Sequence, residues 1–473
     1  MALWDSFMKG MLAFSGFVWG DFMLYFLGLG ALFITLRVGI VQFRHFGYAW
    51  SQTLGKVFRR KDADAPMAAQ GTLSPFEALS TALANTIGSG NIVGVGLAVF
   101  WGGPGAVFWM WLMALLGMAT KFTEAVMGQK YRVQDEAGNW VGGPQYYLSR
   151  GLKRFRLGWL GPFYGLMLVL TLGITEMIQC NSLAGSVHEA FGIPTLASGI
   201  AFTVLVAVIV FGGIKRIGTF AGKVVPFMAA LYIGAGLVVV FTHLSQVPGL
   251  FALIFKSAFS PAAATGGFAG ATVAAAMRWG CARGAFSNEA GDGAAAIAHA
   301  TAATDHPVRQ GLYGIMEVFV DTILVCTVTA LVVLISGVWT DPASAKVPER
   351  LATLAFGVQW GSFGKGLVAV CLTLFAFTSM LAYVYYGEAQ GNYFGGRKLA
   401  MLVRVGFIAA IFAGTFWDAE QLWPFCDVFF AFMIIPNMIG LTLLHGEYGE
   451  LVREFFHTPG KYYLKDTGKA RPV

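Results

Sequence analysis

The most regular feature of the chain is a succession of long apolar segments separated by short polar ones. A helix needs about 20 apolar residues to cross about 30 Å of hydrocarbon, so this pattern predicts an all-α protein with about eleven membrane spans. Residues 2–18 mix apolar and polar positions as an amphipathic helix at the membrane surface does. The expected spans lie near 19–43, 75–100, 104–128, 160–187, 194–213, 222–243, 266–299, 308–337, 360–391, 400–416 and 420–445.

The second apolar segment is interrupted at its middle. The run Asn85-Thr86-Ile87-Gly88-Ser89-Gly90-Asn91 places glycines and small polar side chains at about half depth. Lipid offers no hydrogen-bond partners, so broken backbone at that depth is tolerated only where it lines a cavity or is buried in protein. Secondary transporters use such a break to hold an anionic group and a cation. The glycines could equally serve tight helix packing alone, and their spacing does not decide between the two readings.

The seventh span is interrupted in a similar way. Residues 272–300 contain Gly280, Gly284 and Gly291, together with Arg278, Arg283, Asn288, Glu289 and Asp292. After the first span, two sets of five spans follow, and each set begins with a broken member. If one broken helix enters from the cytoplasm and the other from outside, the sets form an inverted-topology repeat, which favours transport.

Composition and charge agree with a polytopic membrane protein. The 473 residues are 56% hydrophobic and 12% charged, and the mean hydropathy is +0.65. The five cysteines lie in apolar surroundings without CxxC spacing, so neither disulfides nor metal binding are expected. The N-terminus lacks the pattern of a signal peptide.

Lys and Arg gather in alternate loops and in the tail, which places the C-terminus in the cytoplasm and, with an odd number of spans, the N-terminus outside. These residues are Arg59, Arg60, Lys61, Lys130, Arg132, Lys153, Arg154, Arg156, Lys215, Arg216, Lys223, Arg309, Arg397, Lys398, Arg453, Lys461, Lys465, Lys469 and Arg471. We expect a multi-pass protein of a bacterial cell (inner) membrane. Its parts would be an N-terminal region (1–73), a transporter core (74–446) and a cytoplasmic tail (447–473).

Several longer motifs carry a family resemblance. Gly102-Gly103-Pro104-Gly105-Ala106-Val107-Phe108-Trp109-Met110-Trp111 resembles the signature of the alanine or glycine:cation symporter family. Further stretches fit in the same order, and the resemblance covers roughly residues 20–450. They are Thr81–Leu83, Gly117–Phe122, Phe211–Ile217, Arg283–Gly291 and Tyr385–Glu388.

The resemblance implies a LeuT-type fold of five plus five inverted helices after one N-terminal span. It also implies uptake of a small neutral amino acid such as alanine or glycine, driven by sodium and sometimes by protons. The coupling sodium ion, the amino acid and membrane lipid are then the only partners expected. No obligatory protein partner and no nucleic acid are implied.

The substrate class suggests the binding groups. A half-helix N-terminus offers free N–H groups and partial positive charge to a carboxylate, so the amides of Gly88, Ser89 and Gly90, beside Asn91, are candidates. Carbonyl groups near Thr86, or in the second broken helix near Cys281–Gly284, could accept from the ammonium group. In the family, the glutamine that corresponds to Gln179 belongs to the pocket.

Sodium is a hard cation that prefers oxygen ligands. Thr378 and Ser379 place two adjacent hydroxyls at mid-depth in span nine. The resemblance puts a cation between spans two and nine, where carbonyls of Ala84, Ile87 and Phe375 would complete the shell. Membrane Ser and Thr also commonly bond back to their own helix, which is the structural alternative.

Ionisable residues within membrane spans are costly and often functional. Lys121 and Glu124, one turn apart, are expected to form a structural ion pair. Arg283, Glu289 and Asp292 could serve in gating, could bond to the free groups at helix ends, or could contact substrate. Asp321 could be structural. His299 and His306 are expected to be capping or interfacial residues rather than proton carriers.

Two positions depart from the family pattern. Leu381-Ala382-Tyr383 stands where Leu-Gly-Trp is usual, and Glu176 stands three residues before Gln179, where an uncharged residue is expected. Both lie on helices that should line the pocket. A carboxylate there could favour a more polar or cationic substrate such as glutamine or lysine, or make transport proton-sensitive.

Other function classes fit less well. The chain has no HExxH motif, nucleophile elbow or paired His ligands, so no catalytic residues are assigned and an enzyme is not expected. A channel usually needs a ring of pore-lining residues repeated by symmetry. This chain instead has one central break and two similar sets of five spans.

Overall fold

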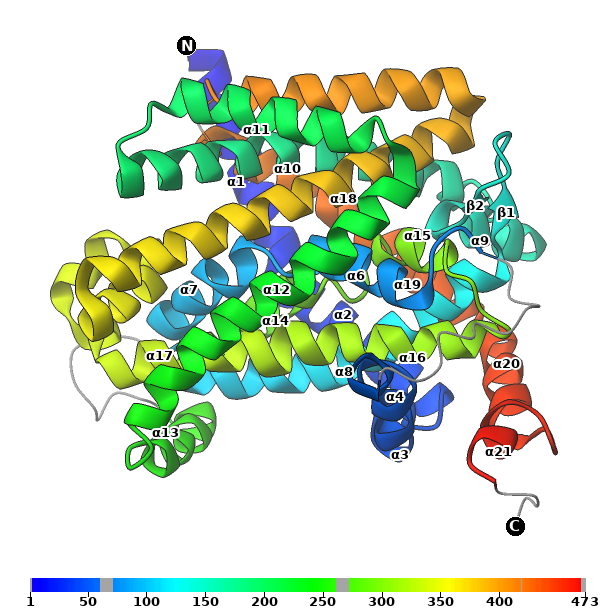
Figure 1. Cartoon of the computed structure of the whole chain (residues 1–473), viewed down its shortest axis with the longest axis horizontal. Coiled ribbons are helices and arrows are strands. Elements are labelled where there is room, and N and C mark those ends of the chain that lie inside the picture. Colours follow the sequence, from blue (N-terminus) through cyan, green and yellow to red (C-terminus); the bar gives the residue numbers. More distant parts are fainter. Residues whose placement is uncertain (1, 60–70, 261–271, 418, 469–473) are drawn as a thin grey trace.

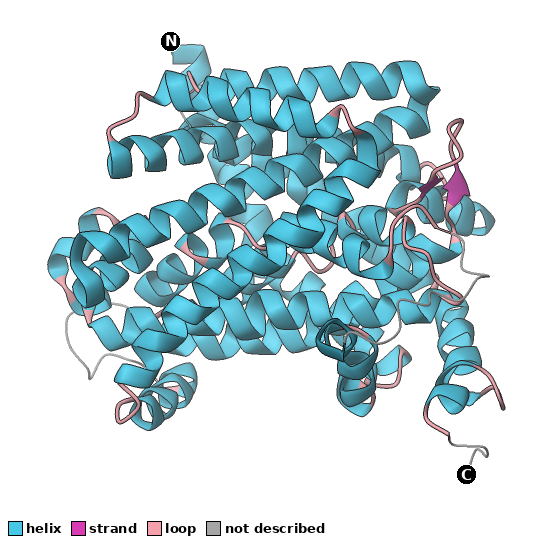
Figure 2. Cartoon of the chain, in the orientation of Figure 1, coloured by secondary structure: helices cyan, strands magenta, loops and turns pink. Residues whose placement is uncertain are grey.

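The computed structural model describes residues 2–59, 71–260, 272–417 and 419–468. The start of expected span 266–299 and the basic residues Arg60, Lys61, Lys469 and Arg471 lie outside these ranges. Helices dominate the described part (Figure 2), and the only strands there are β1 (Val133–Gln134) and β2 (Trp140–Val141), an antiparallel hairpin.

The N-terminal region consists of one long kinked helix and three short ones. The elements are α1 (Ala2–Phe17), the π-helical η1 (Val18–Phe22), α2 (Met23–Arg37), α3 (Val41–Arg44), α4 (Phe46–Gln52) and α5 (Leu54–Arg59). Phe7–Arg37 is a helical stretch long and apolar enough to cross a membrane, and a kink at Gly20 divides it close to the expected boundary between residues 2–18 and the first span. The surface position of residues 2–18 stays a prediction. Ser15 Oγ and Trp19 Nε1 donate to Asp427 Oδ2 and O at 3.1 and 2.8 Å, which fixes this helix against α19.

The following helices include the first break. They are α6 (Pro75–Thr86), η2 (Ser89–Asn91), α7 (Val93–Gly102), α8 (Gly105–Lys130), α9 (Pro144–Gly151), η3 (Leu152–Phe155), α10 (Leu160–Phe191), α11 (Thr195–Val210), α12 (Gly213–Thr242) and α13 (Val247–Phe259). Helix α6 begins where the sequence marks a start. Pro75 is its first residue, and Ser74 and Glu77 form a capping box.

The second set contains the second break and a 64-residue helical stretch that is interrupted by two kinks. Its elements are α14 (Val273–Asn288), α15 (Ala295–Ala300), α16 (Pro307–Val318), the π-helical η5 (Phe319–Cys326), α17 (Thr327–Ser336), three 3₁₀ turns η6 to η8 (Val338–Thr340, Pro342–Lys346, Pro348–Arg350), α18 (Leu351–Gly414) and α19 (Ala419–Leu443). Helix α18 is kinked at Trp360–Gly361 and at Gly395–Gly396. The tail forms α20 (His445–His457) and α21 (Tyr462–Asp466).

Within the described residues, seven helices are long and apolar enough to cross a membrane, and the bent pair α6 and η2–α7 brings the number to as many as eight. Shorter apolar helices are α11 and α13. The chain is therefore an all-helical polytopic membrane protein, and most expected spans coincide with an observed helix within a few residues.

Close helix contact holds the two broken segments in the bundle. Helix α14 packs along α8, and a Cβ built at Gly280 would lie 2.2 Å from the carbonyl oxygen of Ala106. No side chain larger than hydrogen fits there without separating the helices. In Figure 1 the chain runs from α6, right of centre, to α7 on the left, whereas it runs from α14, left of centre, to α15 on the right. The hairpin, α20 and α21 lie at the right of the view, and α13 lies at the lower left.

Candidate functional site

The first broken helix changes direction at Ile87–Gly88, and its two halves are bent by 62°. The Gly88 N–H donates to Asn91 Oδ1 at 2.9 Å instead of continuing the helical ladder. A Cβ at Gly88 or Gly90 would meet no atom closer than 3.5 or 3.4 Å, which is ordinary contact. Tight packing, as at Gly280, therefore does not require these glycines.

The break leaves backbone groups without helical partners. The N–H groups of Ser89 and Gly90 donate to no atom of the described residues, and both residues are partly exposed. On the other side of the bend, the carbonyl of Ala84 lacks the helical partner that the Gly88 N–H would have supplied. Freed donors and freed acceptors thus lie within one turn of each other.

The predicted cation ligands meet at this end of α6. Ser379 Oγ lies 3.0 Å from both Ala84 O and Phe375 O. Thr378 Oγ1 lies 3.0 Å from Phe375 O and 3.1 Å from Leu374 O. Ser379 therefore joins α18 to the broken helix, whereas Thr378 bonds to carbonyls of its own helix and lies 3.5 Å from Met228 Sδ of α12.

Ile87 follows the last residue of α6 and is fully buried, but its carbonyl has no contact that joins it to this group. Thr86 is buried, and its hydroxyl bonds back to Ala82 O at 3.4 Å. Four of the five predicted cation ligands are therefore adjacent, namely Ala84, Phe375, Thr378 and Ser379.

The side chains expected to contact substrate come from α10 and α18. Gln179 Nε2 lies 4.0 Å from the Cβ position of Gly88, and the Tyr383 side chain lies beside Gln179. Glu176 is fully buried, and neither of its carboxyl oxygens has a hydrogen-bond partner within the described structure. Gln179 therefore faces the break, and Glu176 is a buried carboxyl without a bonding partner.

The second broken helix meets the first through its last turn. Phe286 Cδ1 and Ser287 Cα lie 3.4 and 3.6 Å from the Cβ position of Gly90. Gly284 packs against Met110 of α8. Cys281 lines a small apolar cavity beside α2. The residues next to the first break are thus one turn further along α14 than the expected Cys281–Gly284.

Asp321 joins the two broken helices. Its Oδ1 accepts from Asn91 Nδ2 at 2.6 Å, and its Oδ2 accepts from Ser287 Oγ at 2.9 Å and Thr322 Oγ1 at 2.7 Å. Asp321 lies in π-helical η5, and π-helical turns frequently mark functional sites. At the second break Glu289 adopts a left-handed conformation, and its carboxylate accepts a hydrogen bond from Asn85.

Buried charges brace the second break. The expected Lys121–Glu124 ion pair is replaced by other partners, because Lys121 Nζ lies 3.5 Å from Glu317 Oε1 and donates to Glu289 O at 3.1 Å. Glu124 Oε1 instead accepts from Gly291 N at 2.9 Å and from Asn437 Nδ2 at 2.8 Å.

The two histidines have different roles. His306 accepts from Val308 N at 3.2 Å and caps α16, as expected. His299 is fully buried, and its Nε2 lies 2.8 Å from Glu317 Oε2, so the expected capping or interfacial role is wrong for it.

Sequence reasoning had not singled out Glu317 or Asn437. Each is a polar residue within a predicted apolar span, which is the signal that could have found them. All five cysteines are buried and free. No cluster of three or more His, Cys, Asp or Glu side chains that could hold a metal ion occurs among the described residues.

Comparisons with known proteins show which family the chain belongs to. The chain is 42% identical to the sodium/alanine symporter AgcS of Methanococcus maripaludis, over 91% of this chain and 93% of that protein. It is 35% identical to the probable sodium/glutamine symporter GlnT of Bacillus subtilis, over 90% and 86% of the two chains. A manganese transporter of Eremococcus coleocola has a similar fold, with a TM-score of 0.53 and 15% identity over 80% of this chain and 88% of that one.

The sodium:alanine symporter family matches residues 4–466, nearly the whole chain. Its members are transporters rather than enzymes, which agrees with the freed backbone groups at mid-helix. The chain belongs to the sodium:alanine symporter family.

Proposed function

We propose that this protein couples sodium entry to the uptake of a small neutral amino acid, of the alanine or glycine type, into the cytoplasm. The observation that carries the proposal is the break at Ile87–Gly88. It offers unpaired N–H groups on one side and, on the other, carbonyl and hydroxyl oxygens that meet between α6 and α18. An amino-acid carboxylate and a sodium ion need these two kinds of group.

The substrate would lie against the break. The amides of Ser89 and Gly90 would hold the carboxylate, while the Gly88 amide keeps its bond to Asn91 and fixes the turn. Gln179 and Tyr383 would contact the bound molecule from α10 and α18. The ammonium group would meet carbonyls of the two breaks, near Thr86 and at the end of α14 near Phe286–Ser287.

Sodium would lie between α6 and α18. Ser379 Oγ, Thr378 Oγ1 and the carbonyls of Ala84 and Phe375 would supply oxygen ligands, and Ile87 O is the fifth ligand proposed. Both hydroxyls donate to the carbonyl of Phe375, so their hydrogens already point away from their oxygen lone pairs. Those lone pairs could bind a cation.

The architecture proposed is one N-terminal span followed by two inverted sets of five, as in the LeuT-type fold. The opposite directions of the two broken helices in Figure 1 support it. So do the kink at Gly395–Gly396, which divides α18 into two expected spans, and α11, which supplies a shorter one. With the hairpin and tail in the cytoplasm and the N-terminus outside, the basic loops lie inside. Residues 1–73, 74–446 and 447–473 would then form the N-terminal region, the core and the tail of an inner-membrane protein.

Glu176 and Tyr383 are proposed to set substrate choice. A buried carboxyl without a partner is costly, so Glu176 must be protonated or must meet substrate or water during transport. If it meets substrate, a more polar or cationic amino acid such as glutamine or lysine is favoured, and one relative is named as a probable glutamine symporter. If it is protonated, uptake depends on pH.

The test is counterflow in proteoliposomes with alanine, glycine, serine, glutamine and lysine, with and without sodium. We expect saturable, sodium-dependent exchange of alanine or glycine. A channel would give flux that neither saturates nor depends on the cation. Glu176→Asn and Tyr383→Trp, singly and together, should change the order of competition among these amino acids or its dependence on pH. An unchanged order and pH dependence in all three variants would show that Glu176 is purely structural.

A further inference from the structure

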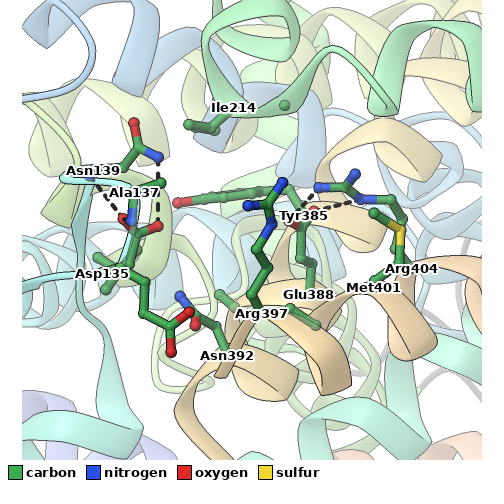
Figure 3. A pocket seen from close by; sticks show the side chains of 15 residues that line it. Asp135, Ala137, Asn139, Ile214, Tyr385, Glu388, Asn392, Arg397, Met401 and Arg404 are labelled. Atoms are coloured by element: carbon green, nitrogen blue, oxygen red, sulfur yellow. Dashed lines mark hydrogen bonds and ion pairs between the residues drawn. The ribbon is translucent and has the colours of Figure 1, made fainter. Parts of the chain in front are cut away.

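A cavity of about 270 Å³, lined by several charged side chains among apolar ones, lies away from the two breaks, at the end of the molecule that carries the hairpin. Figure 3 shows its wall, which combines the hairpin turn, the start of α12 and both sides of the Gly395–Gly396 kink in α18. The residues that matter for its chemistry are Asp135, Asn139, Tyr385, Glu388, Arg397 and Arg404. At about 30 Å³ per water molecule, this volume is large enough for a small organic molecule.

Some of these charges are already satisfied within the protein. Arg404 and Glu388 form a bidentate ion pair, with Arg404 Nε 3.0 Å from Glu388 Oε2. Asp135 Oδ1 accepts from the backbone N–H groups of Ala137 and Asn139 at 2.9 and 2.8 Å, which holds the hairpin turn. Asp135 Oδ2 has only a long 3.4 Å contact with Asn139 Nδ2 and remains available to another donor.

Two groups have no partner within the protein. Arg397 is exposed to solvent and forms no ion pair or hydrogen bond within the described ranges of the chain. Tyr385 is 5% exposed, and its hydroxyl has no hydrogen-bond partner. In Figure 3 the Tyr385 ring crosses the cavity, and its hydroxyl points toward the hairpin turn. A buried hydroxyl without a partner is destabilising, and a ligand in the cavity that accepts its hydrogen bond would remove that cost.

We propose that this cavity binds a free α-amino acid in its zwitterionic form. Arg397 and the Tyr385 hydroxyl would donate to the carboxylate, and Asp135 Oδ2 would accept from the ammonium group. An anion without an amino group would meet the negative charges of Asp135 and of Glu136, which also lines the cavity, and a simple cation would meet Arg397. A zwitterion satisfies both, and none of these side chains belongs to the site at the broken helices.

The position of the cavity links it to transport, and this step rests on the proposed function. Tyr385 follows Ser379 by six residues on α18, which is about 9 Å along a helix. In the proposed orientation this direction leads to the cytoplasm. The cavity would therefore hold the transported amino acid a second time, on the side where it is released.

The experiment counts bound amino acid. Purified protein in detergent, with sodium present, is titrated with radiolabelled L-alanine, glycine and L-glutamine, and saturation is measured by equilibrium dialysis. For the amino acid that the protein takes up, we expect about two equivalents per chain. Arg397→Gln and Tyr385→Phe should each bind only one, and the retained equivalent shows that they are folded. Lys398→Gln, which changes the neighbouring exposed cation, is the matched control and should still bind two.

The outcomes separate the two proposals. One equivalent in the wild type, together with sodium-dependent uptake, overturns the second site and leaves the proposed function intact. Two equivalents in Arg397→Gln and Tyr385→Phe also overturn it, because the named donors would then be unnecessary. Absence of both binding and uptake for all three amino acids contradicts both proposals.

Discussion

Ser379 offers the sharpest single-residue test of the cation site. Its hydroxyl is 3.0 Å from Ala84 O and Phe375 O, so it touches both helices that would surround the ion. Ser379→Ala removes one oxygen ligand and the hydrogen bond that joins α18 to the broken helix. Loss of a buried interaction of this kind costs about 1–2 kcal/mol, which corresponds to about a 5- to 30-fold change in an equilibrium constant.

The sodium concentration for half-maximal uptake should therefore rise by about that factor, whereas substrate affinity at saturating sodium should change little. Uptake into proteoliposomes is measured while choline replaces sodium at constant ionic strength. Thr373→Ala is the matched control, because the Thr373 hydroxyl lies on the same helix and bonds only to Ala369 O, at 2.8 Å. If the sodium titration of Ser379→Ala superimposes on that of Thr373→Ala, the assignment of Ser379 to the cation is refuted.

Three further predictions concern the break, its bracing and the tail. Gly90→Val should abolish uptake without preventing folding, because the new side chain extends toward Phe286 and the proposed carboxylate position; unchanged substrate affinity in the purified variant would contradict it. Asp321→Ala should lower stability by roughly 3 kcal/mol, since buried donors on three elements lose their acceptor, and a thermal midpoint in detergent equal to the wild type would count against this role. At the tail, partial burial alone would raise the pKa of Asp466, but bonds from Tyr48 and Arg309 outweigh it and lower that pKa. The stabilisation is therefore present above the ordinary aspartate pKa and is lost as the pH falls through the lowered one. Asp466→Asn should speed amide exchange in α20–α21 at neutral pH but not at acid pH, and the control Glu450→Gln should leave the exchange rates unchanged at both. Equal exchange rates in Asp466→Asn and the wild type at neutral pH would disprove the contribution of Asp466.

The apolar pattern predicted the helices and the central break well, because both depend on local sequence. A run such as Asn85–Asn91 cannot continue a helix at low cost, and the structure bends there by 62°. The contact between Ser379 and Ala84 was predicted from the family resemblance, because hydrophobic periodicity does not indicate which helices are neighbours. The start of α6 could be read directly from Ser74, Pro75 and Glu77.

Pairing between distant helices could not be predicted in this way. Lys121 and Glu124 are one turn apart, yet each bonds to a helix more than a hundred residues away. Which partner a buried charge selects depends on tertiary packing, and the sequence offers only the presence of the charge. The same holds for Ser15 of α1, whose hydroxyl donates to Asp427 of α19, more than four hundred residues away.

The central claim is that an amino acid and sodium are carried together through the site at the first break. The most direct measurement uses purified protein in sealed proteoliposomes, with an inward sodium gradient and labelled alanine or glycine outside. Thermodynamic coupling is reciprocal, so the same vesicles are also given an inward amino-acid gradient and labelled sodium. We predict that each gradient drives accumulation of the other solute above its outside concentration. Equilibration of the amino acid without accumulation, or accumulation that is unchanged when sodium is replaced by choline, would contradict sodium-coupled symport.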